Sequence, residues 1–350
     1  MLSPFESVDI KSNLIMKNGN RGKHYGYFYI LLFSFCCLTS TASFAYQIQS
    51  RSVMVMDASK GEMLYAKNPY VRRPPASTTK LMTAIVTIEN ANLTDIATIS
   101  KNASRVAPHK AGFRRGDKVT VENLLYAALL GSANDAAVAL AEAVAGSETQ
   151  FVTLMNTKAI AIGALNTRFT NSSGLPSSGQ YTTVYDLAQI MNYALLYKKL
   201  KEIIGTRVTK IYMENGNSIF LRNTNRLLWS QGDLVGGKTG YTRKAMHCFV
   251  CAAARDNETV IVAILGSPGR DDLWRESGTL ISKGFEVLGN KAKPDVYFTE
   301  TYSDASDIGE VSYEKNMKDK ASSSKYRETK KIVSRKTTRH KKTKVLTKKA

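Results

Sequence analysis

The chain reads Pro74-Pro75-Ala76-Ser77-Thr78-Thr79-Lys80-Leu81-Met82-Thr83-Ala84 at the point where a strongly helical run begins. The two prolines interrupt regular structure, and apolar residues then recur at helical spacing. Ser77 is therefore expected in the first turn of a helix, with Lys80 one turn further along the same side. Because a serine hydroxyl needs a base to become a nucleophile, the two residues form a candidate nucleophile–base pair.

The charge of Lys80 decides whether this pair can work. A lysine ammonium cannot accept a proton, but burial and a second nearby cation both lower the pKa of a lysine. Lys238 is the candidate second cation. The alternative is that Ser77 caps a helix and Lys80 is solvated. That alternative leaves two further elements unexplained, Ser132-Ala133-Asn134 and Lys238-Thr239-Gly240.

Ser132-Ala133-Asn134 follows an apolar segment that begins near Glu122 and predicts a helix ended by Gly131. The next helix is expected from about Asp135. A tight loop between two buried helices would hold a hydroxyl and an amide side by side over a cleft. The same residue types are also common helix caps, which is the alternative interpretation.

Lys238-Thr239-Gly240 is expected just before a buried strand over residues 247–254, whose returning strand covers residues 259–265. A glycine here would let a ligand backbone lie close to the strand edge. Lys238 and Thr239 would then face a carboxylate. The alternative is a solvated lysine on an edge strand.

Three such elements in this order are shared by penicillin-binding proteins and class A β-lactamases. The chain resembles the low-molecular-mass penicillin-binding proteins, which are serine-type D-alanyl-D-alanine carboxypeptidases. The resemblance covers about residues 48–288 and rests on these stretches as well: Pro75–Ala84, Ser132–Ala137, Val144–Ser147, Asn171–Pro176, Asn223–Asn225 and Lys238–Thr242.

The resemblance implies an α+β fold of the β-lactamase/transpeptidase-like type, an antiparallel sheet flanked by helices with an inserted all-helical subdomain. The sequence pattern agrees, because a hairpin is expected over residues 53–57 and 63–66, a helical middle follows, and a closing helix is expected over residues 276–288. The cleft would lie where the two parts meet.

The resemblance also implies roles in catalysis. Ser77 would attack the penultimate D-alanine carbonyl of a peptidoglycan stem pentapeptide ending in D-Ala-D-Ala. Lys80 would be the base, and Ser132 would relay a proton to the leaving amine. The backbone N–H groups of Ser77 and Tyr241 would form the oxyanion hole. β-Lactams would be covalent inhibitors, and no metal or cofactor is implied.

The remaining roles concern substrate binding. Asn134 would hold the substrate amide, and the strand segment with Lys238, Thr239 and Gly240 would receive the terminal carboxylate. Members of the family often place an arginine after the last strand to bind this carboxylate. Its usual place falls here near Leu273, which Arg270 and Arg275 flank, and the sequence leaves the choice open.

Three other functions share some of these features. A class A β-lactamase needs a glutamate in the middle loop for deacylation, and residues 166–186 contain none. A DD-endopeptidase that cuts peptide cross-links stays open. A non-catalytic cell-wall-binding protein is disfavoured because all three catalytic elements are intact.

The N-terminal residues 1–45 have the pattern of a secretory signal peptide. Arg21 and Lys23 precede an apolar run over residues 25–38, and Ser43-Phe44-Ala45 ends in a small residue, so cleavage is expected after Ala45. Met16 is an alternative start that would give a signal of ordinary length. The run is too short for a comfortable membrane span. We therefore expect an exported, periplasmic protein whose catalytic domain covers residues 46–288.

The C-terminal part changes character. Residues 289–314 are expected to be a polar linker, and residues 315–350 contain 15 Lys and Arg against two acids, a net charge of +13 in a chain whose formal net charge is +20. This composition predicts a disordered tail. Behind a secretory signal it favours anionic envelope polymers or lipid head groups over nucleic acid, placing the protein peripherally on the membrane or wall. A purely solubilising tail is the alternative.

The expected mature chain keeps Cys248 and Cys251. Residues three apart in a strand point to opposite faces, which favours two buried thiols over a disulfide or half a zinc site. A Ser-His-Asp triad would need His109 or His247, and both are expected to be surface or packing histidines.

Overall fold

The computed structural model describes residues 47–300. The predicted signal peptide (1–45) and basic tail (315–350) lie outside these residues, as do residues 301–314. Within the described part, no helix is both long and apolar enough to cross a membrane.

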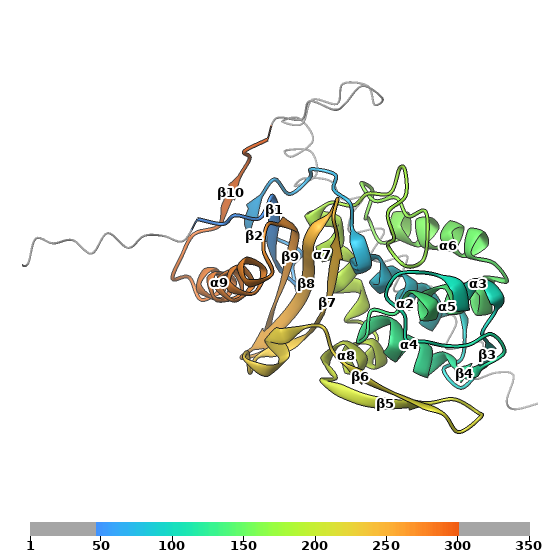
Figure 1. Ribbon diagram of the computed structural model, residues 1–350. Helices are drawn as coiled ribbons and strands as arrows, with labels where there is room; N and C mark the ends of the chain where they lie inside the picture. Colours follow the sequence, from blue (N-terminus) through green and yellow to red (C-terminus); the bar gives the residue numbers. More distant parts are fainter. Residues whose placement is uncertain (1–46, 301–350) are drawn as a thin grey trace, which may run out of the picture. The chain divides into compact units, whose positions relative to one another are not determined.

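A six-stranded sheet forms one half of the unit that begins at Gln49, in the order β10-β2-β1-β9-β8-β7 (Figure 1). All neighbouring strands are antiparallel except β10 and β2, which are parallel. The strands are β1 (Ser52–Asp57), β2 (Met63–Lys67), β7 (Leu234–Thr242), β8 (Met246–Arg255), β9 (Glu258–Ser267) and β10 (Asp295–Tyr297). The expected hairpins β1–β2 and β8–β9 are thus confirmed.

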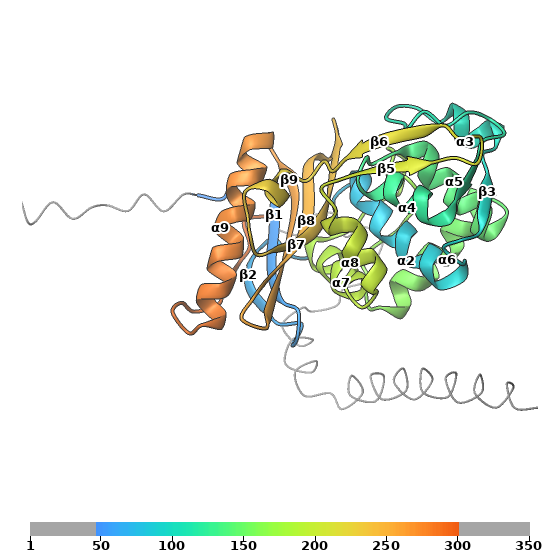
Figure 2. The ribbon, with the colours of Figure 1, turned by 90° about the horizontal axis from the view of Figure 1, so that it is seen from below.

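Helices cover both faces of this sheet. α9 (Arg270–Leu288) packs against β1, β2, β8 and β9 on one side, and α7 (Val184–Ala194) contacts β1, β8 and β9 from the other (Figure 2). Because both faces are covered, β1 and the middle of β9 are buried along their length and read as almost continuous apolar runs.

A helical region is inserted between β2 and β7, as the resemblance implies (Figure 1). At its centre is α5, which packs against α2, α3, α4 and α6. The inserted elements are η1 (Ala76–Thr79), α2 (Lys80–Asn90), β3 (Ile96–Thr98), α3 (Lys101–Arg105), β4 (Lys118–Thr120), α4 (Val121–Leu129), α5 (Asn134–Ala145), α6 (Glu148–Ala161), α7, α8 (Lys198–Gly205), β5 (Val208–Tyr212), β6 (Ser218–Arg222) and η2 (Arg226–Trp229).

Two boundaries differ from the sequence prediction. Lys238-Thr239-Gly240 lies inside edge strand β7 rather than before a strand. Glycine is uncommon inside strands, so Gly236 and Gly237 keep the sequence pattern from indicating a strand here. Both glycines are nevertheless needed, because neighbouring segments pack closely against them. A Cβ on Gly236 would lie 2.6 Å from the Ile204 carbonyl carbon, and one on Gly237 would lie 2.5 Å from the Val250 oxygen.

The closing part of the fold is also longer than predicted. α9 begins at Arg270 rather than Glu276, because its polar first turn carries Asp271 and Asp272, which suit the positive end of a helix. The sheet also continues past residue 288, since β10 lies within the stretch interpreted as a linker and pairs with β2. The sheet is therefore mixed at this edge rather than wholly antiparallel.

Candidate active site

A cleft of about 820 Å³ opens where β7 meets the helical region. Ser77 from η1, Ser132 from the α4–α5 connection, Asn134 at the start of α5, and Thr239 and Gly240 from β7 all line it. The structure therefore brings together the three elements that the sequence singled out. The Ser77 segment forms a short 3₁₀ turn that leads into α2, rather than the first turn of α2 itself.

Lys80 is fully buried and lies against the candidate nucleophile. Its Nζ is 2.9 Å from Ser77 Oγ, 2.7 Å from Asn134 Oδ1 and 2.6 Å from the Ser173 carbonyl oxygen. Burial, followed by the charge of Lys238, holds the pKa of Lys80 well below its usual value. Asn134 Oδ1 and the Ser173 carbonyl oxygen can only accept hydrogen bonds, so they orient two N–H groups of the Lys80 amine.

Lys238 is a second buried lysine, on β7. Its Nζ donates to Ser132 Oγ at 2.9 Å and to the Thr239 carbonyl oxygen at 2.9 Å. Burial lowers its pKa to about 7. Ser132 is thus tied to β7 across the cleft, and it holds a left-handed backbone (φ 59°) that is uncommon for a residue with a side chain.

The position of Asn134 depends on a loop that the sequence did not reveal. The Asn134 backbone N–H donates to the His109 carbonyl oxygen at 2.9 Å, and its side-chain amide donates to the Pro108 carbonyl oxygen. The buried Asp135 carboxylate in turn accepts hydrogen bonds from three successive backbone N–H groups of this loop, at residues 111–113. Asp135 therefore holds the loop over residues 108–113 in place, and this loop in turn positions the Asn134 side chain.

Gly240 has a different role from the one expected. A Cβ at this position would lie 2.9 Å from the Ser77 backbone nitrogen and 3.0 Å from Ala76 Cβ. The missing side chain therefore lets β7 approach the nucleophile segment itself, rather than a ligand backbone. Next to it, Thr239 Oγ1 lies 2.6 Å from Thr224 Oγ1, which links β7 to the segment after β6.

The loop over residues 171–176 supports the nucleophile segment from the other side. A Cβ on Gly174 would lie 1.8 Å from the Ala76 carbonyl oxygen, and Gly174 has φ +82°, so only glycine fits. The Ser172 carbonyl accepts from Thr83 Oγ1 at 2.6 Å, and the Ser173 carbonyl accepts from Lys80. The resemblance included this stretch, but no side-chain pattern could reveal that its backbone oxygen contacts the base.

The structure distinguishes the two candidate arginines. Arg270, at the start of α9, lines the cleft beside Tyr241 and His247, whereas Arg275 pairs with Asp272 on the same helix. Burial and then the charge of Arg270 lower the pKa of His247. Of the two candidates, Arg270 is therefore the one that lines the cleft.

The remaining sequence candidates lie outside the catalytic contacts. Cys248 and Cys251 are free, buried thiols, and burial raises the pKa of both. His109 is exposed, with its ring Nε2 2.9 Å from the Gly131 carbonyl oxygen. His247 packs on the ring of Tyr241, with centroids 4.6 Å apart. Among residues 47–300, no three His, Cys, Asp or Glu side chains gather to hold a metal ion.

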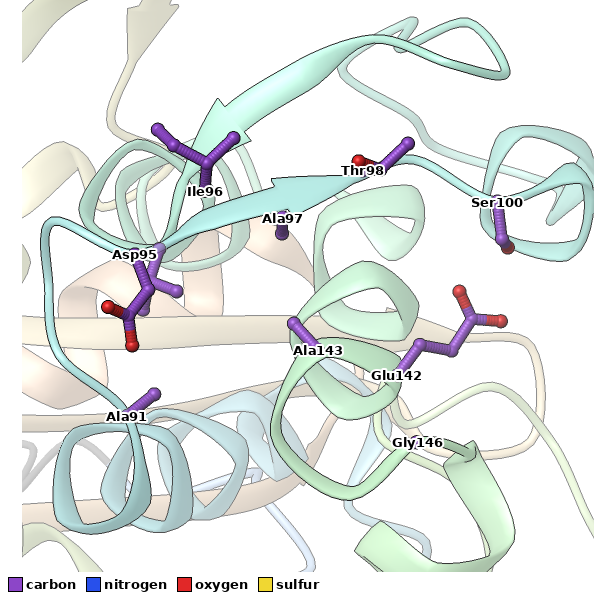
Figure 3. A pocket seen from close by; sticks show the side chains of 10 residues that line it. Ala91, Asp95, Ile96, Ala97, Thr98, Ser100, Glu142, Ala143 and Gly146 are labelled. Atoms are coloured by element: carbon purple, nitrogen blue, oxygen red, sulfur yellow. The ribbon is translucent and has the colours of Figure 1, made fainter.

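A second cavity, of about 420 Å³, lies between the end of α2, β3 and α5 (Figure 3). Asp95 and Glu142 are the charged residues that line it. It contains none of the sequence-predicted site residues.

Known proteins match this arrangement. A family model described as D-alanyl-D-alanine carboxypeptidase matches residues 39–269. The chain is 33% identical over 224 residues to D-alanyl-D-alanine carboxypeptidase DacF of Bacillus subtilis, covering 63% of this chain and 58% of that one. It is 32% identical over 239 residues to D-alanyl-D-alanine carboxypeptidase DacB2 of Mycobacterium tuberculosis, covering 67% and 81%. The chain thus spans less than two thirds of DacF and 65% of the Escherichia coli relative DacC.

Solved structures agree with the sequence comparison. The Streptomyces K15 DD-transpeptidase superposes with a TM-score of 0.65 at 32% identity, covering 68% of this chain and 98% of that one. A D-alanyl-D-alanine carboxypeptidase from Mycobacterium tuberculosis gives a TM-score of 0.65 at 30% identity, covering 68% and 92%. The predicted fold class is confirmed, and the chain belongs to the D-alanyl-D-alanine carboxypeptidase family.

Proposed function

We propose that this protein is a serine-type D-alanyl-D-alanine carboxypeptidase that removes the terminal D-alanine from peptidoglycan stem pentapeptides. The observation that carries the proposal is the arrangement around Lys80 Nζ. A neutral lysine amine has two N–H groups and one lone pair. The two acceptors Asn134 Oδ1 and Ser173 O take the N–H groups, which directs the lone pair to Ser77 Oγ at 2.9 Å.

The first half of the reaction follows from these contacts. Lys80 accepts the proton of the Ser77 hydroxyl while Oγ bonds to the carbonyl carbon of the penultimate D-alanine. The backbone N–H groups of Ser77 and Tyr241 stabilise the oxyanion. Lys238 and Thr239, with Arg270, receive the terminal carboxylate. The C–N bond then breaks, and Ser132 passes a proton to the leaving amine; Asn134 holds the substrate amide.

Water completes the reaction by releasing the acyl group from Ser77 Oγ. For a β-lactam, this second half should be slow. Among residues 47–300, no Asp or Glu lines the cleft. Glu148, which reaches the 171–176 loop from α6, accepts hydrogen bonds from the Ser172 backbone N–H and hydroxyl instead. β-Lactams would therefore remain attached as covalent inhibitors rather than be turned over.

The location of the reaction follows from the ends of the chain. A cleaved signal peptide over residues 1–45 would deliver the protein to the periplasm. The tail over residues 315–350, with its net charge of +13, would hold it on an anionic membrane or wall surface. This attachment should weaken as salt rises, because exposed charges are screened within about 8–10 Å at physiological ionic strength.

The test of the proposed function compares the wild type with Ser77→Ala. The wild type should release D-alanine from a soluble stem pentapeptide and form a stable covalent adduct with fluorescent penicillin. Ser77→Ala should do neither, while its circular dichroism spectrum stays unchanged. A covalent penicillin adduct on Ser77→Ala would show that the nucleophile has been wrongly assigned.

A further inference from the structure

We infer that Glu148, the first residue of α6, is a positioning residue for the proposed base. Its carboxylate holds the backbone at Ser172 and thereby keeps the carbonyl of the next residue, Ser173, against Lys80 Nζ. Glu148 itself does not line the cleft, so it acts through the loop over residues 171–176. The inference rests on the proposed function, because Lys80 is assigned as the base there.

Two helices hold Ser172 by the two ends of its backbone. Glu148 Oε1 on α6 accepts hydrogen bonds from the Ser172 N–H at 2.9 Å and from the Ser172 hydroxyl at 2.6 Å. Thr83 Oγ1 on α2 donates to the Ser172 carbonyl oxygen at 2.6 Å. Because α6 packs against α2, which begins at Lys80, these bonds fix the position of Ser172 relative to the base.

The peptide group between Ser173 and Gly174 makes the contact with Lys80. Its carbonyl oxygen accepts from Lys80 Nζ at 2.6 Å, and its N–H donates to Asn171 Oδ1 at 2.7 Å. A peptide group is planar, so its carbonyl and its N–H turn together. A shift of the backbone at Ser172 would therefore turn this carbonyl away from Lys80 and leave the amine less well oriented.

Burial makes the bonds from Ser172 to Glu148 hard to replace. Ser172 is 0% exposed and Ser173 is 2% exposed. A buried N–H or hydroxyl without an acceptor is unfavourable, because it has lost its hydrogen bonds to water. Without the Glu148 carboxylate, the loop should therefore move until both donors of Ser172 find other partners. The segment that moves is the one that orients Lys80.

Capping of α6 does not explain why Glu148 reaches the loop. The N-cap of this helix is Ser147, whose side chain accepts from the Gln150 N–H at 3.3 Å. An acid in the first turn is favourable near the positive end of a helix, but that effect requires no contact with a distant segment. The Glu148 carboxylate bonds instead to a residue 24 positions further along the chain. It therefore supports the loop rather than the helix end.

The surroundings of Lys80 determine what loss of the Ser173 carbonyl would do. Burial lowers the pKa of Lys80, the charge of Lys238 on β7 lowers it further, and the charge of Asp135 on α5 raises it. An oxygen that accepts from the amine also favours the charged form. Displacement of the Ser173 carbonyl should therefore lower the pKa of Lys80 further. The acid limb of acylation, where the rate falls because Lys80 is protonated, should then move to lower pH.

The test measures acylation of the full chain by benzylpenicillin as a function of pH, by stopped flow. Glu148→Ala should lower the plateau rate by about 10-fold, within the range of coupling inside one hydrogen-bond network, and should move the midpoint of the acid limb to lower pH. A merely structural role would lower the melting temperature without moving this midpoint, because the midpoint reports the protonation of Lys80.

Glu148→Gln separates the hydrogen bonds from the charge. A single oxygen, Glu148 Oε1, accepts both bonds from Ser172, and an amide oxygen also has two lone pairs. The glutamine variant should therefore keep the wild-type midpoint and most of the plateau rate. Ser172→Ala removes only the bond from the hydroxyl, so it should move the midpoint in the same direction as Glu148→Ala but by less. The serine variant decides the question if Glu148→Ala does not fold.

The matched control is Glu276→Ala. Glu276 lies on α9, is buried and also accepts from the backbone N–H and hydroxyl of a serine, Ser50, which precedes β1. Neither Glu276 nor Ser50 lines the cleft. Because buried donors lose their acceptor in this variant as well, its melting temperature should fall. The midpoint of its acid limb should stay at the wild-type pH.

Three results would overturn the inference. The first is an unchanged midpoint in both Glu148→Ala and Ser172→Ala. The second is a midpoint in Glu148→Gln that moves as far as in Glu148→Ala, and the third is an equal shift in Glu276→Ala. Failure of the proposed function would appear differently, as a wild type that forms no penicillin adduct and releases no D-alanine.

Discussion

The two cavities described above differ in how many energetically unfavourable features lie beside them. At the cleft beside β7, two fully buried lysines bond to lining residues, Lys80 to Ser77 and Lys238 to Ser132. Ala76, His109 and Ser132 also hold left-handed backbones. The cavity between α2, β3 and α5 has neither feature (Figure 3). Buried cations and left-handed non-glycine residues are each unfavourable by themselves, so they persist where the surrounding fold enforces them.

The polar groups beside the two cavities also differ in their hydrogen bonds. Asp95 accepts hydrogen bonds from Asn92, and Glu142 accepts one from Asn102 through Oε1, so both acids are held by neighbouring polar groups. Beside the cleft, the Asn134 and Ser173 oxygens accept two hydrogen bonds from Lys80 Nζ, and the third bonding direction of this nitrogen points to Ser77 Oγ. A hollow in the surface is therefore not enough to mark a site. What distinguishes the cleft is that two buried lysine amines lie within hydrogen-bond distance of the Ser77 and Ser132 hydroxyls.

The largest expected effect comes from Lys80→Arg, which places a permanent positive charge at this position and removes the proposed base. Arginine stays protonated in proteins, so it cannot accept the Ser77 proton. We expect acylation by benzylpenicillin to fall by about 10²–10⁴-fold, the usual range for loss of a general base. Stopped-flow measurement of acylation rates checks this. Near-normal acylation by the arginine variant would mean that Lys80 acts only through its charge.

A smaller effect is expected from Gly240→Ala, which tests the approach of β7 to Ser77. The new Cβ would lie 2.9 Å from the Ser77 nitrogen, which is one donor of the proposed oxyanion hole, and would displace it. Loss of one oxyanion donor costs about 10²–10³-fold in rate, so a displaced donor should cost up to about 10²-fold in acylation.

The control for this change is Gly232→Ala. Gly232 lies between η2 and β7, and a Cβ there meets nothing within 4 Å. Its variant should acylate like the wild type. If both glycine variants lose activity equally, the effect comes from general damage to the fold rather than from the contact with Ser77.

The sequence predicted the parts of the site that are local in the chain. Ser77 and Lys80 are one turn apart, and Ser132 lies two residues before Asn134 at the start of α5, so each pair is close in the chain as well as in space. The hairpins β1–β2 and β8–β9 were also predicted, because their apolar runs are separated by clear turn residues.

What the sequence could not predict depends on contacts between distant segments. Asp135 is bonded to backbone groups more than twenty residues away, and no side-chain pattern marks them. The sequence suggested that Gly240 makes room for a ligand backbone. Its neighbour is instead the Ser77 nitrogen, which belongs to a distant element of the chain. Arg270 and Arg275 lie on one helix, and only the pairing of Arg275 with Asp272 in three dimensions separates them.

A third prediction concerns the pH dependence of acylation by benzylpenicillin. Lys80 must be neutral to act, so the rate should fall toward acid, by about tenfold per pH unit below its lowered pKa. Lys238 attracts a carboxylate only when protonated, and its pKa is about 7 in the free protein. Affinity for the carboxylate ligand should therefore fall as pH rises above neutrality, although a bound carboxylate will raise the pKa of Lys238.

Lys238→Arg separates the two limbs of this profile. Arginine keeps its charge across the whole range, so the alkaline loss of affinity should disappear while the acid limb remains. An acid limb that vanishes in this variant would instead assign that titration to Lys238.

The smallest effect is expected from Glu142→Gln in the second cavity. Glu142 Oε1 accepts from Asn102 Nδ2 at 3.0 Å, and Oε2 is buried without a partner, so the substitution removes a charge and keeps the shape of the side chain. Because the unpaired carboxylate oxygen is unfavourable where it lies, the melting temperature should stay unchanged or rise. Acylation should stay within about 2-fold of the wild type, since distant sites without shared partners usually couple by no more than about 0.3–0.5 kcal/mol. A fall in acylation of about tenfold would show that α5 transmits changes in this cavity to Asn134 at its opposite end, and the contrast between the two cavities would no longer hold.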